Sequence, residues 1–193
     1  MLDFKKLWKG EHLEVVSPEE YSYEAVHEDN VIMVLPVLAV KSKFIKGMTN
    51  YYLAIRKEIC PPYLIKDKGV GPYYYTTITG KMDKEGETPE QTMRREMIEE
   101  AGIELIDYTV MLYKKDMPVC KTTDMRANIF VILVDEFNTV EATGDGTVTE
   151  EMSKTIFVEL GKVNEMIEKP NVDFLLYGVY QILMNVIGNY IRI

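Results

Sequence analysis

One short segment near the middle of the chain constrains the fold most, because it carries the signals for both ends of a helix. Thr88 and Gln91 have the spacing of a capping box, and Pro89 stands at the favoured first helical position. Gly102 is a typical residue for ending a helix. Between these ends, apolar residues recur at four-residue spacing: Met93, Met97 and Ala101. We therefore predict a helix over residues 89–101 that buries one face.

The polar side of this helix carries three glutamates, Glu96, Glu99 and Glu100. Glu96 lies beside the other two, at the i+3 and i+4 positions, where like charges repel by about 0.2–0.5 kcal/mol per pair. A solvated helix face would explain them simply, because glutamate is a good helix former. A hard divalent cation, which takes several oxygen ligands, would instead offset the repulsion directly. On spacing alone both interpretations stand.

The rest of the chain is typical of an α+β protein with a mixed sheet. Residues 1–30 form an expected arm of half-exposed β-strands, ahead of one domain over residues 31–193. Within that domain, Pro36 implies an edge strand or a bulge. A long loop is expected over residues 136–150 and a terminal helix over residues 172–190. Apolar runs predict the strands, at residues 31–40, 51–59, 73–78, 108–113, 128–134 and 155–158.

Composition excludes several classes of function. The 193 residues carry a formal net charge of −9, which argues against non-specific nucleic-acid binding. The start of the chain has no signal-peptide pattern, and its most apolar run is too short to cross a bilayer. The two cysteines, Cys60 and Cys120, lack metal-site or disulfide spacing. We expect a cytoplasmic protein with neither a nucleic-acid nor a membrane partner.

The helix and the loop before it resemble the Nudix box, which reads Gly, five residues, Glu, seven residues, then Arg-Glu-apolar-x-Glu-Glu-x-Gly-apolar. The positions that match are Glu87, Arg95, Glu96, Met97, Glu99, Glu100, Gly102 and Ile103. One departure is plain: six residues, rather than five, separate Gly80 from Glu87. The additional residue lies in the loop before the helix, where an insertion costs little entropy.

The resemblance implies a metal-dependent hydrolase with a Nudix-type α/β/α sandwich. It implies that Glu96 and Glu100 ligate Mg²⁺ or Mn²⁺, together with the main-chain carbonyl of Thr79. Glu99 would ligate the cation or orient its water. Such cations neutralise a diphosphate and make water a better nucleophile.

The same resemblance gives two further expectations about catalytic residues. Arg95 would pair with Glu87 and hold the loop onto the helix. A glutamate in the loop before the last strand would act as a base or an additional metal ligand, and both Glu150 and Glu151 fall there. The sequence does not choose between them, and without the resemblance an acidic pair on a loop is usually only solvated.

Beyond the box, the chain resembles the ADP-ribose pyrophosphatase branch, which implies hydrolysis of ADP-ribose to AMP and ribose 5-phosphate. The resemblance implies a homodimer whose arm supplies His12 and Tyr23 to the adenine, although two half-exposed strand residues are an equal alternative. It also implies substrate contacts by Lys57 and Pro118. Cys60 replaces an arginine of that branch, and residues 76–80 replace its usual Glu-x-Pro-Ala-Gly.

Two other functions stay open. The first is cleavage of a different nucleotide, such as NADH, a dinucleoside polyphosphate or a nucleotide sugar. The second is a ligand sensor with the same fold and no catalysis. Such sensors generally lose the glutamates of the box, and this chain keeps all three, which favours an enzyme.

Overall fold

The computed structural model of the protein describes residues 4–9, 14–18, 25–59, 73–120, 123–144 and 153–190. Its centre is a seven-stranded mixed sheet with the order β10-β5-β4-β9-β8, in which β6 also pairs with β5 and β7 with β4. The strands of this sheet are β4 (Val31–Lys41), β5 (Thr49–Ile59), β6 (Tyr73–Thr76), β7 (Ile78–Lys81), β8 (Ile103–Pro118), β9 (Arg126–Thr139) and β10 (Lys154–Glu159).

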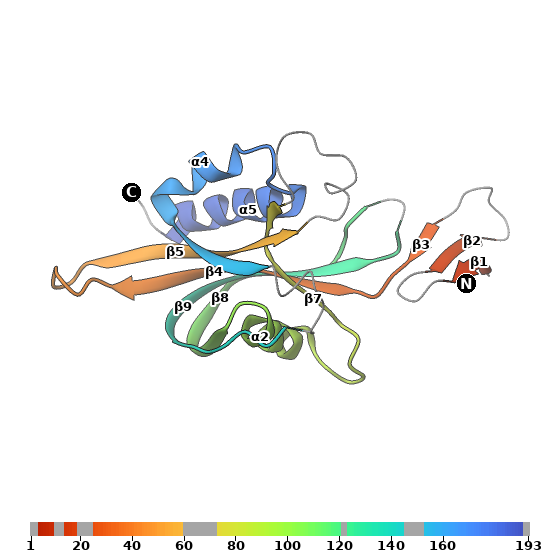
Figure 1. Cartoon of the computed structure of the whole chain (residues 1–193), viewed down its shortest axis with the longest axis horizontal. Coiled ribbons are helices and arrows are strands. Elements are labelled where there is room, and N and C mark those ends of the chain that lie inside the picture. Colours follow the sequence, from red (N-terminus) through yellow and green to blue (C-terminus); the bar gives the residue numbers. More distant parts are fainter. Residues whose placement is uncertain are drawn as a thin grey trace.

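Helices cover both faces of the sheet (Figure 1). The helices are α2 (Pro89–Glu99), α4 (Val163–Ile167), which follows a short 3₁₀ turn (Leu160–Lys162), and α5 (Phe174–Tyr190). Side chains alternate along β4, so Ile32 and Val34 pack with α2 while Met33 and Leu35 pack with α4 and α5. The expected α/β/α sandwich with a mixed sheet is therefore present.

Strand β4 lies inside the sheet, so the expectation that Pro36 marks a sheet edge is wrong. On one side β4 runs parallel to β9, and Pro36 itself is in register with Ile132. On the other side, β7 pairs with β4 up to Val34 and β5 begins to pair at Val37. Pro36 therefore falls where the partner strand changes, a place where a missing backbone donor is tolerated in a central strand.

Helix α2 has the predicted start and the predicted buried face, and it ends at Glu99, two residues before the predicted end. The Thr88 side chain accepts from the Gln91 amide, and the Gln91 side chain accepts from the Thr88 amide. At the other end, Gly102 has a φ of +63°, which explains the preference for glycine there. The buried apolar residues are Met93, Met97 and Ala101.

Three predicted strands differ from those in the structure. The strand predicted over residues 73–78 is two strands, β6 and β7, which pair with β5 and β4 respectively. Strand β9 continues to Thr139, in register with Ile103, so the expected loop begins at residue 140 rather than at residue 136. Strand β8 likewise extends over sixteen residues. Residues 135–139 include charged and polar side chains, so their pairing with β8 left little apolar pattern in the sequence. The terminal helix begins at Phe174, close to its predicted start.

The arm forms a separate three-stranded antiparallel sheet with the order β1-β2-β3. Its strands are β1 (Phe4–Lys9), β2 (Glu14–Pro18) and β3 (Ala25–His27). Figure 1 shows this sheet at one end of the molecule, beyond the sandwich. In the described part of the chain no helix is long and apolar enough to cross a membrane.

Candidate active site

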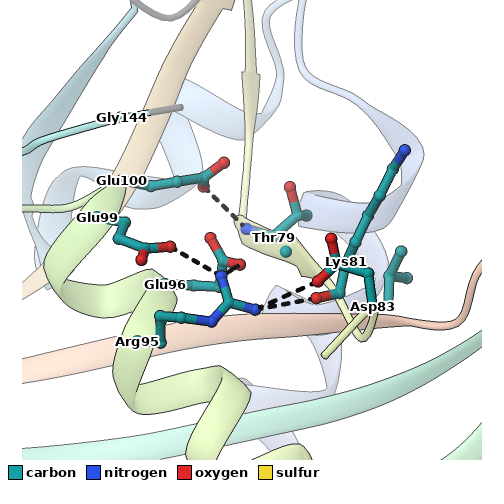
Figure 2. A pocket seen from close by; sticks show the side chains of 10 residues that line it. Thr79, Lys81, Asp83, Arg95, Glu96, Glu99, Glu100 and Gly144 are labelled. Atoms are coloured by element: carbon teal, nitrogen blue, oxygen red, sulfur yellow. Dashed lines mark hydrogen bonds and ion pairs between the residues drawn. The ribbon is translucent and has the colours of Figure 1, made fainter. Parts of the chain in front are cut away.

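The three glutamates of α2 line one open cavity of about 480 Å³ between the helix and strand β7 (Figure 2). The residues that line it are Val31, Thr79, Gly80, Lys81, Asp83, Arg95, Glu96, Glu99, Glu100 and Gly144. Thr79 and Gly80 come from β7, which β4 fixes through the pairs Met33–Thr79 and Ile32–Gly80. The central sheet therefore places a strand of backbone opposite the carboxylate face of the helix.

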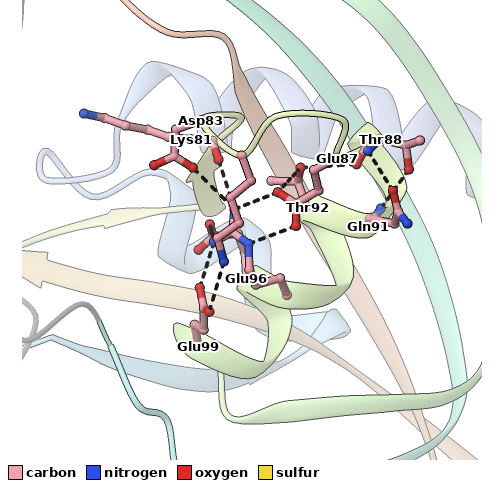
Figure 3. A network of polar contacts seen from close by, with 10 residues as sticks. Lys81, Asp83, Glu87, Thr88, Gln91, Thr92, Glu96 and Glu99 are labelled. Carbon is pink, nitrogen blue, oxygen red and sulfur yellow. Dashed lines mark hydrogen bonds and ion pairs between the residues drawn. The ribbon is translucent and has the colours of Figure 1, made fainter.

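Arg95 ties the loop before α2 to the helix. Figure 3 shows the polar network around it, in which Glu87 of the loop lies beside Thr92 of the helix. The Nε and Nη2 atoms of Arg95 donate to the two oxygens of Glu87, each at 3.1 Å. Nη2 also donates to the main-chain carbonyl of Lys81 at 3.1 Å. The hydrogen bonds from Arg95 lower the pKa of the Glu87 carboxyl, and the same bonds raise the pKa of the guanidinium. This is the pairing that the motif implies.

The other side of the Arg95 guanidinium faces the cavity. Its Nη1 atom pairs with Glu96 and lies 2.8 Å from an oxygen of Glu99. Arg95 therefore lies within ion-pair distance of four carboxylates, those of Glu87, Glu96, Glu99 and, at 3.9 Å, Asp83. The charges of the cavity are only partly balanced by the protein itself.

Gly80 lets the backbone of β7 approach the helix closely. A Cβ atom at this position would lie 2.1 Å from the Glu96 side chain, so any other residue would collide with that carboxylate. The additional residue between Gly80 and Glu87 has not moved Gly80 away from the site. Its contact with Glu96 shows that the additional residue is absorbed farther along the loop.

Glu96 is buried and Glu100 is partly buried. Burial raises the pKa of Glu96 to about 7, with repulsion from Glu99 and attraction to Arg95 acting in opposite directions. Burial also raises the pKa of Glu100 to about 8, and the nearby Glu58 carboxylate adds to the shift. The Thr79 amide donates to Glu100 Oε2 at 3.3 Å. Burial therefore disfavours the ionised forms of both groups, and a bound cation would favour them.

Strand β5 supplies a contact that the sequence did not reveal. Arg56 is 4% exposed, and its Nη1 atom donates to the main-chain carbonyl of Glu100 at 2.7 Å. Its Nε atom donates to Glu58 at 3.3 Å, and Tyr74 donates to the other oxygen of Glu58 at 3.0 Å. Thr155 on β10 also donates to the Glu100 carbonyl. The C-terminal end of α2 is thus fixed to two strands.

The family assignment rests on the whole central part of the chain. A model of the NUDIX domain matches residues 53–176, which is more than half of the sequence. The chain belongs to the Nudix family. As a member, it is a Nudix pyrophosphohydrolase, an enzyme whose substrate is a small-molecule nucleotide.

A solved structure of an ADP compounds hydrolase is similar in fold. The likeness covers 95% of this chain and 93% of that chain, with a TM-score of 0.60 and 17% sequence identity. At this identity the likeness supports the Nudix fold rather than a substrate. No curated protein matches the chain significantly.

The donor set of this Nudix site fits a divalent cation, the metal that enzymes of the family generally use. Glu96 and Glu100, with raised pKa values, and Glu99 at the cavity mouth are hard oxygen donors, and the nearby cations Arg95, Arg56 and Lys84 are shared with other carboxylates. Among the described residues, no three acidic, cysteine or histidine side chains already converge as a metal cage. Arg95 instead pairs with Glu96 and Glu99, while Glu100 faces the Thr79 amide.

The predicted substrate residues lie away from this cavity or outside the described residues. Lys57 lies on β5 with its Nζ atom 4.2 Å from the centre of the Tyr73 ring. Pro118 ends β8 and lines an apolar groove together with Phe174. Neither residue is among those that line the carboxylate cavity. Four further candidates fall outside the described residues: His12, Tyr23, Glu150 and Glu151.

Proposed function

We propose that this Nudix enzyme hydrolyses ADP-ribose to AMP and ribose 5-phosphate in a reaction that depends on Mg²⁺ or Mn²⁺. One water molecule is consumed: its oxygen bonds to one phosphorus, and the bridge between the two phosphates breaks. The observation that carries the proposal is the cavity in which Glu96, Glu99 and Glu100 face the backbone of β7. The hydrolase of similar fold acts on ADP compounds, which supports an ADP-containing substrate.

Glu96 and Glu100 would hold the cation, with Glu99 and the main-chain carbonyl of Thr79 as further donors. When bound, a divalent cation would neutralise the diphosphate, polarise phosphorus and lower the pKa of water. An acidic chain that acts on a polyanion needs such a charge mediator. The raised pKa values of Glu96 and Glu100 support this assignment, because a cation would stabilise their ionised forms.

Arg95 and Glu87 would act by positioning. Their two hydrogen bonds, and the bond from Arg95 to the Lys81 carbonyl, hold the loop that carries Asp83 against the start of α2. In hydrolysis of this type, positioning and electrostatic stabilisation supply most of the rate enhancement.

The described residues on both sides of residues 145–152 contact helix α2, which supports a catalytic base from this segment. The Gly144 amide donates to the Glu99 carbonyl at 3.0 Å, and Thr155 donates to the Glu100 carbonyl at 3.3 Å. Both flanks therefore contact the C-terminal end of α2. We assign the proton acceptor to Glu150 or Glu151, and single Gln variants at the two positions distinguish them.

We also propose that the arm joins two copies of the chain and brings His12 and Tyr23 to the adenine. The arm sheet has three short strands, and a sheet of that size needs packing against another surface to be stable. In the described residues it joins the body through a short stretch in which His27 pairs with Asp124 and the Thr123 hydroxyl donates to Glu28. A variant without residues 1–30 should become monomeric in light scattering and show a raised KM. An unchanged, monomeric enzyme would remove the arm from the proposal.

The substrate panel that tests the function contains ADP-ribose, NADH, a diadenosine polyphosphate and a nucleotide sugar. Each is incubated with Mg²⁺, with Mn²⁺ and with a chelator, and the products are separated by chromatography. We expect AMP release from ADP-ribose to be fastest and to stop with the chelator.

Two other outcomes would change the proposal in different ways. Faster cleavage of another substrate would keep the carboxylate chemistry and discard ADP-ribose. No turnover of any substrate, with Mn²⁺ still bound, would favour the ligand sensor. A third result, turnover that the chelator leaves unaffected, would contradict the metal assignment itself.

A further inference from the structure

The turn between β4 and β5 carries a surface unlike the rest of the protein. We call residues 42–48, together with Lys41 at the end of β4, the hairpin tip. Figure 1 shows it protruding at the end of the molecule opposite the arm. Pairing of β4 with β9 ends at Leu38, whereas pairing with β5 continues to Lys41 and Thr49, so the tip extends past the neighbouring strand.

Apolar side chains of the tip point into solvent. Phe44 is 95% exposed, Ile45 is 58% exposed and Met48 is 44% exposed. Apolar side chains gathered on a surface usually mark a contact with another molecule. These three residues lie within a span of five positions, so they form a cluster rather than scattered exceptions.

Three lysines surround this cluster on an otherwise acidic protein. Lys41, Lys43 and Lys46 are exposed, and in the described part of the chain none of them forms an ion pair. The whole chain has a net charge of −9, yet residues 41–48 contain no acidic residue. The tip therefore presents positive charge while the rest of the molecule repels an anionic surface.

Local hydrogen bonds hold the tip in one shape. The Ser42 hydroxyl accepts from the amides of Phe44 and Ile45, at 3.2 and 3.0 Å. The Ser42 amide donates to the Met48 carbonyl at 2.8 Å, and Gly47 supplies the positive φ of +83° that closes the turn. Because the exposed conformation is already ordered, docking through it would lose little conformational entropy.

We propose that the hairpin tip docks on an anionic lipid surface, with Phe44 and Ile45 in the headgroup region and the lysines near the lipid charges. A convex tip fits a deformable surface, whereas a protein partner would need a matching hollow. Phe44 alone could stack on a nucleic-acid base, whereas Ile45 and Met48 are aliphatic and suit a lipid headgroup region better than a row of bases. Such docking is peripheral and needs no spanning segment, so the proposal revises the expectation from the sequence that the protein has no membrane partner.

The expected strength follows from the charge. Each lysine near an anionic bilayer contributes about a fivefold increase in partitioning, so three contribute about a hundredfold. Salt should weaken the association, because exposed charges are screened within about 10 Å at moderate ionic strength.

The test is co-sedimentation of the full-length protein with vesicles of phosphatidylcholine, with and without phosphatidylserine, at low and at high salt. We expect binding to the anionic vesicles at low salt only. The variant Lys43→Glu/Lys46→Glu should reduce partitioning by more than about tenfold, and Phe44→Ser should reduce it severalfold. Turnover of nucleotide in solution should not change in either variant.

Two matched controls separate the tip from general surface effects. Lys114→Glu/Lys115→Glu makes the same charge change on exposed positions of β8, and Phe174→Ala removes another exposed aromatic ring, 83% exposed on α5. Both controls should bind vesicles as the wild type does. In a Phe44→Trp variant, anionic vesicles should shift the emission to shorter wavelength relative to the wild type, whose single tryptophan is Trp8.

Several results would overturn the proposal. The first is that wild-type protein stays in the supernatant with anionic vesicles at low salt. Equal loss of binding in the β8 control would show that net charge, rather than the tip, is responsible. Retention by single-stranded RNA or by a second copy of the chain, without vesicle binding, would assign the tip to that partner instead.

Discussion

The carboxylates at the two ends of helix α2 have pKa values that are shifted in opposite directions. At the N-terminal end, Glu87 accepts two hydrogen bonds from Arg95 and one from Thr92, and its carboxyl has a lowered pKa. At the C-terminal end, Glu96 is buried and Glu100 is partly buried, and they have raised pKa values of about 7 and about 8. The carboxylate just before the helix is therefore fully paired, whereas Glu96 shares Arg95 with other carboxylates and Glu100 has only a long contact of 3.8 Å with Arg56.

This difference separates structure from chemistry within the same motif. A paired carboxylate that accepts several hydrogen bonds stabilises the fold and gains little from another cation. A buried carboxylate without a full countercharge costs stability, and a bound cation would offset that cost. The C-terminal end of α2, with Glu96 and Glu100, is the unsatisfied end, where a ligand with positive charge would be stabilising. The N-terminal end, where Glu87 pairs with Arg95, is the satisfied end, and this pair holds the loop in place.

The strongest test of this comparison is Glu100→Gln. The substitution keeps the shape of the side chain but removes a proposed metal donor, so we expect turnover to fall about a thousandfold. Folding should persist, and stability without metal should be equal or higher, because a buried charge is removed. Turnover of ADP-ribose and thermal unfolding with a chelator measure the two effects. Glu136→Gln, at an exposed position of β9, is the matched control and should behave as the wild type. Near-normal turnover in Glu100→Gln would contradict the metal assignment.

Arg56→Met tests whether β5 holds the unsatisfied end in place. The change leaves the partly buried Glu58 without its arginine and removes one of two donors to the Glu100 carbonyl. Breaking a buried ion pair leaves the remaining charge desolvated and without a partner. The free energy of unfolding should therefore fall by about 3 kcal/mol. Denaturant unfolding measures this loss.

A double variant keeps this prediction specific. Arg56→Met/Glu58→Met removes both charges and should regain part of the stability that the single variant loses. A Mn²⁺ titration of both variants then reports on position: we expect weaker binding whenever Arg56 is missing. Equal Mn²⁺ affinity in wild type and variants would limit Arg56 to a structural role.

Arg56 also illustrates which parts of the site the sequence could predict. The capping box, the apolar stripe and Gly102 are local features whose partners lie within a few residues, and the structure has them as predicted. Arg56 and Glu100 are 44 positions apart, and their contact depends on strand β5 passing the end of α2. No local pattern encodes that crossing.

The fold, like the site, has features that the sequence predicts and features that it does not. The class and the two helices followed from periodicity, and the resemblance supplied the sandwich. The mistake at Pro36 arose because a single strand can change partners along its length, which only the assembled sheet reveals. The short helix α4 was not predicted, since its five residues show too few turns for a helical pattern.

Glu87→Gln tests the satisfied end and should have a smaller effect. Arg95 would keep its contacts with Glu96 and Glu99 but lose its ion pair with the loop. We expect the free energy of unfolding to fall by about 1 kcal/mol and turnover to fall about tenfold, because a positioning contact is weakened while the proposed donors stay. Urea unfolding and steady-state kinetics measure these changes. Glu85→Gln, an exposed position in the same loop, should change neither quantity. A thousandfold loss of turnover in Glu87→Gln would erase the distinction between the two ends.

The smallest effect is expected for Asp173, a partly buried carboxylate outside the site. It tests whether a carboxyl pKa raised by burial is enough to indicate a functional group. Its side chain accepts from the Leu176 amide at 2.7 Å at the start of α5, yet burial raises its pKa, and Glu58 adds to the shift. An acid with a raised folded-state pKa binds more protons when folded, so its contribution to stability is present at low pH and is lost as the pH rises through that pKa. Asp173→Asn keeps a good helix cap and removes the charge, so at neutral pH it should be as stable as the wild type or more stable by less than about 1 kcal/mol. The difference should vanish toward the pH at which Asp173 is protonated, and Mn²⁺ affinity should not change. A loss of metal affinity in this variant would mean that a raised carboxyl pKa does not distinguish the cavity of α2 from an ordinary buried helix cap.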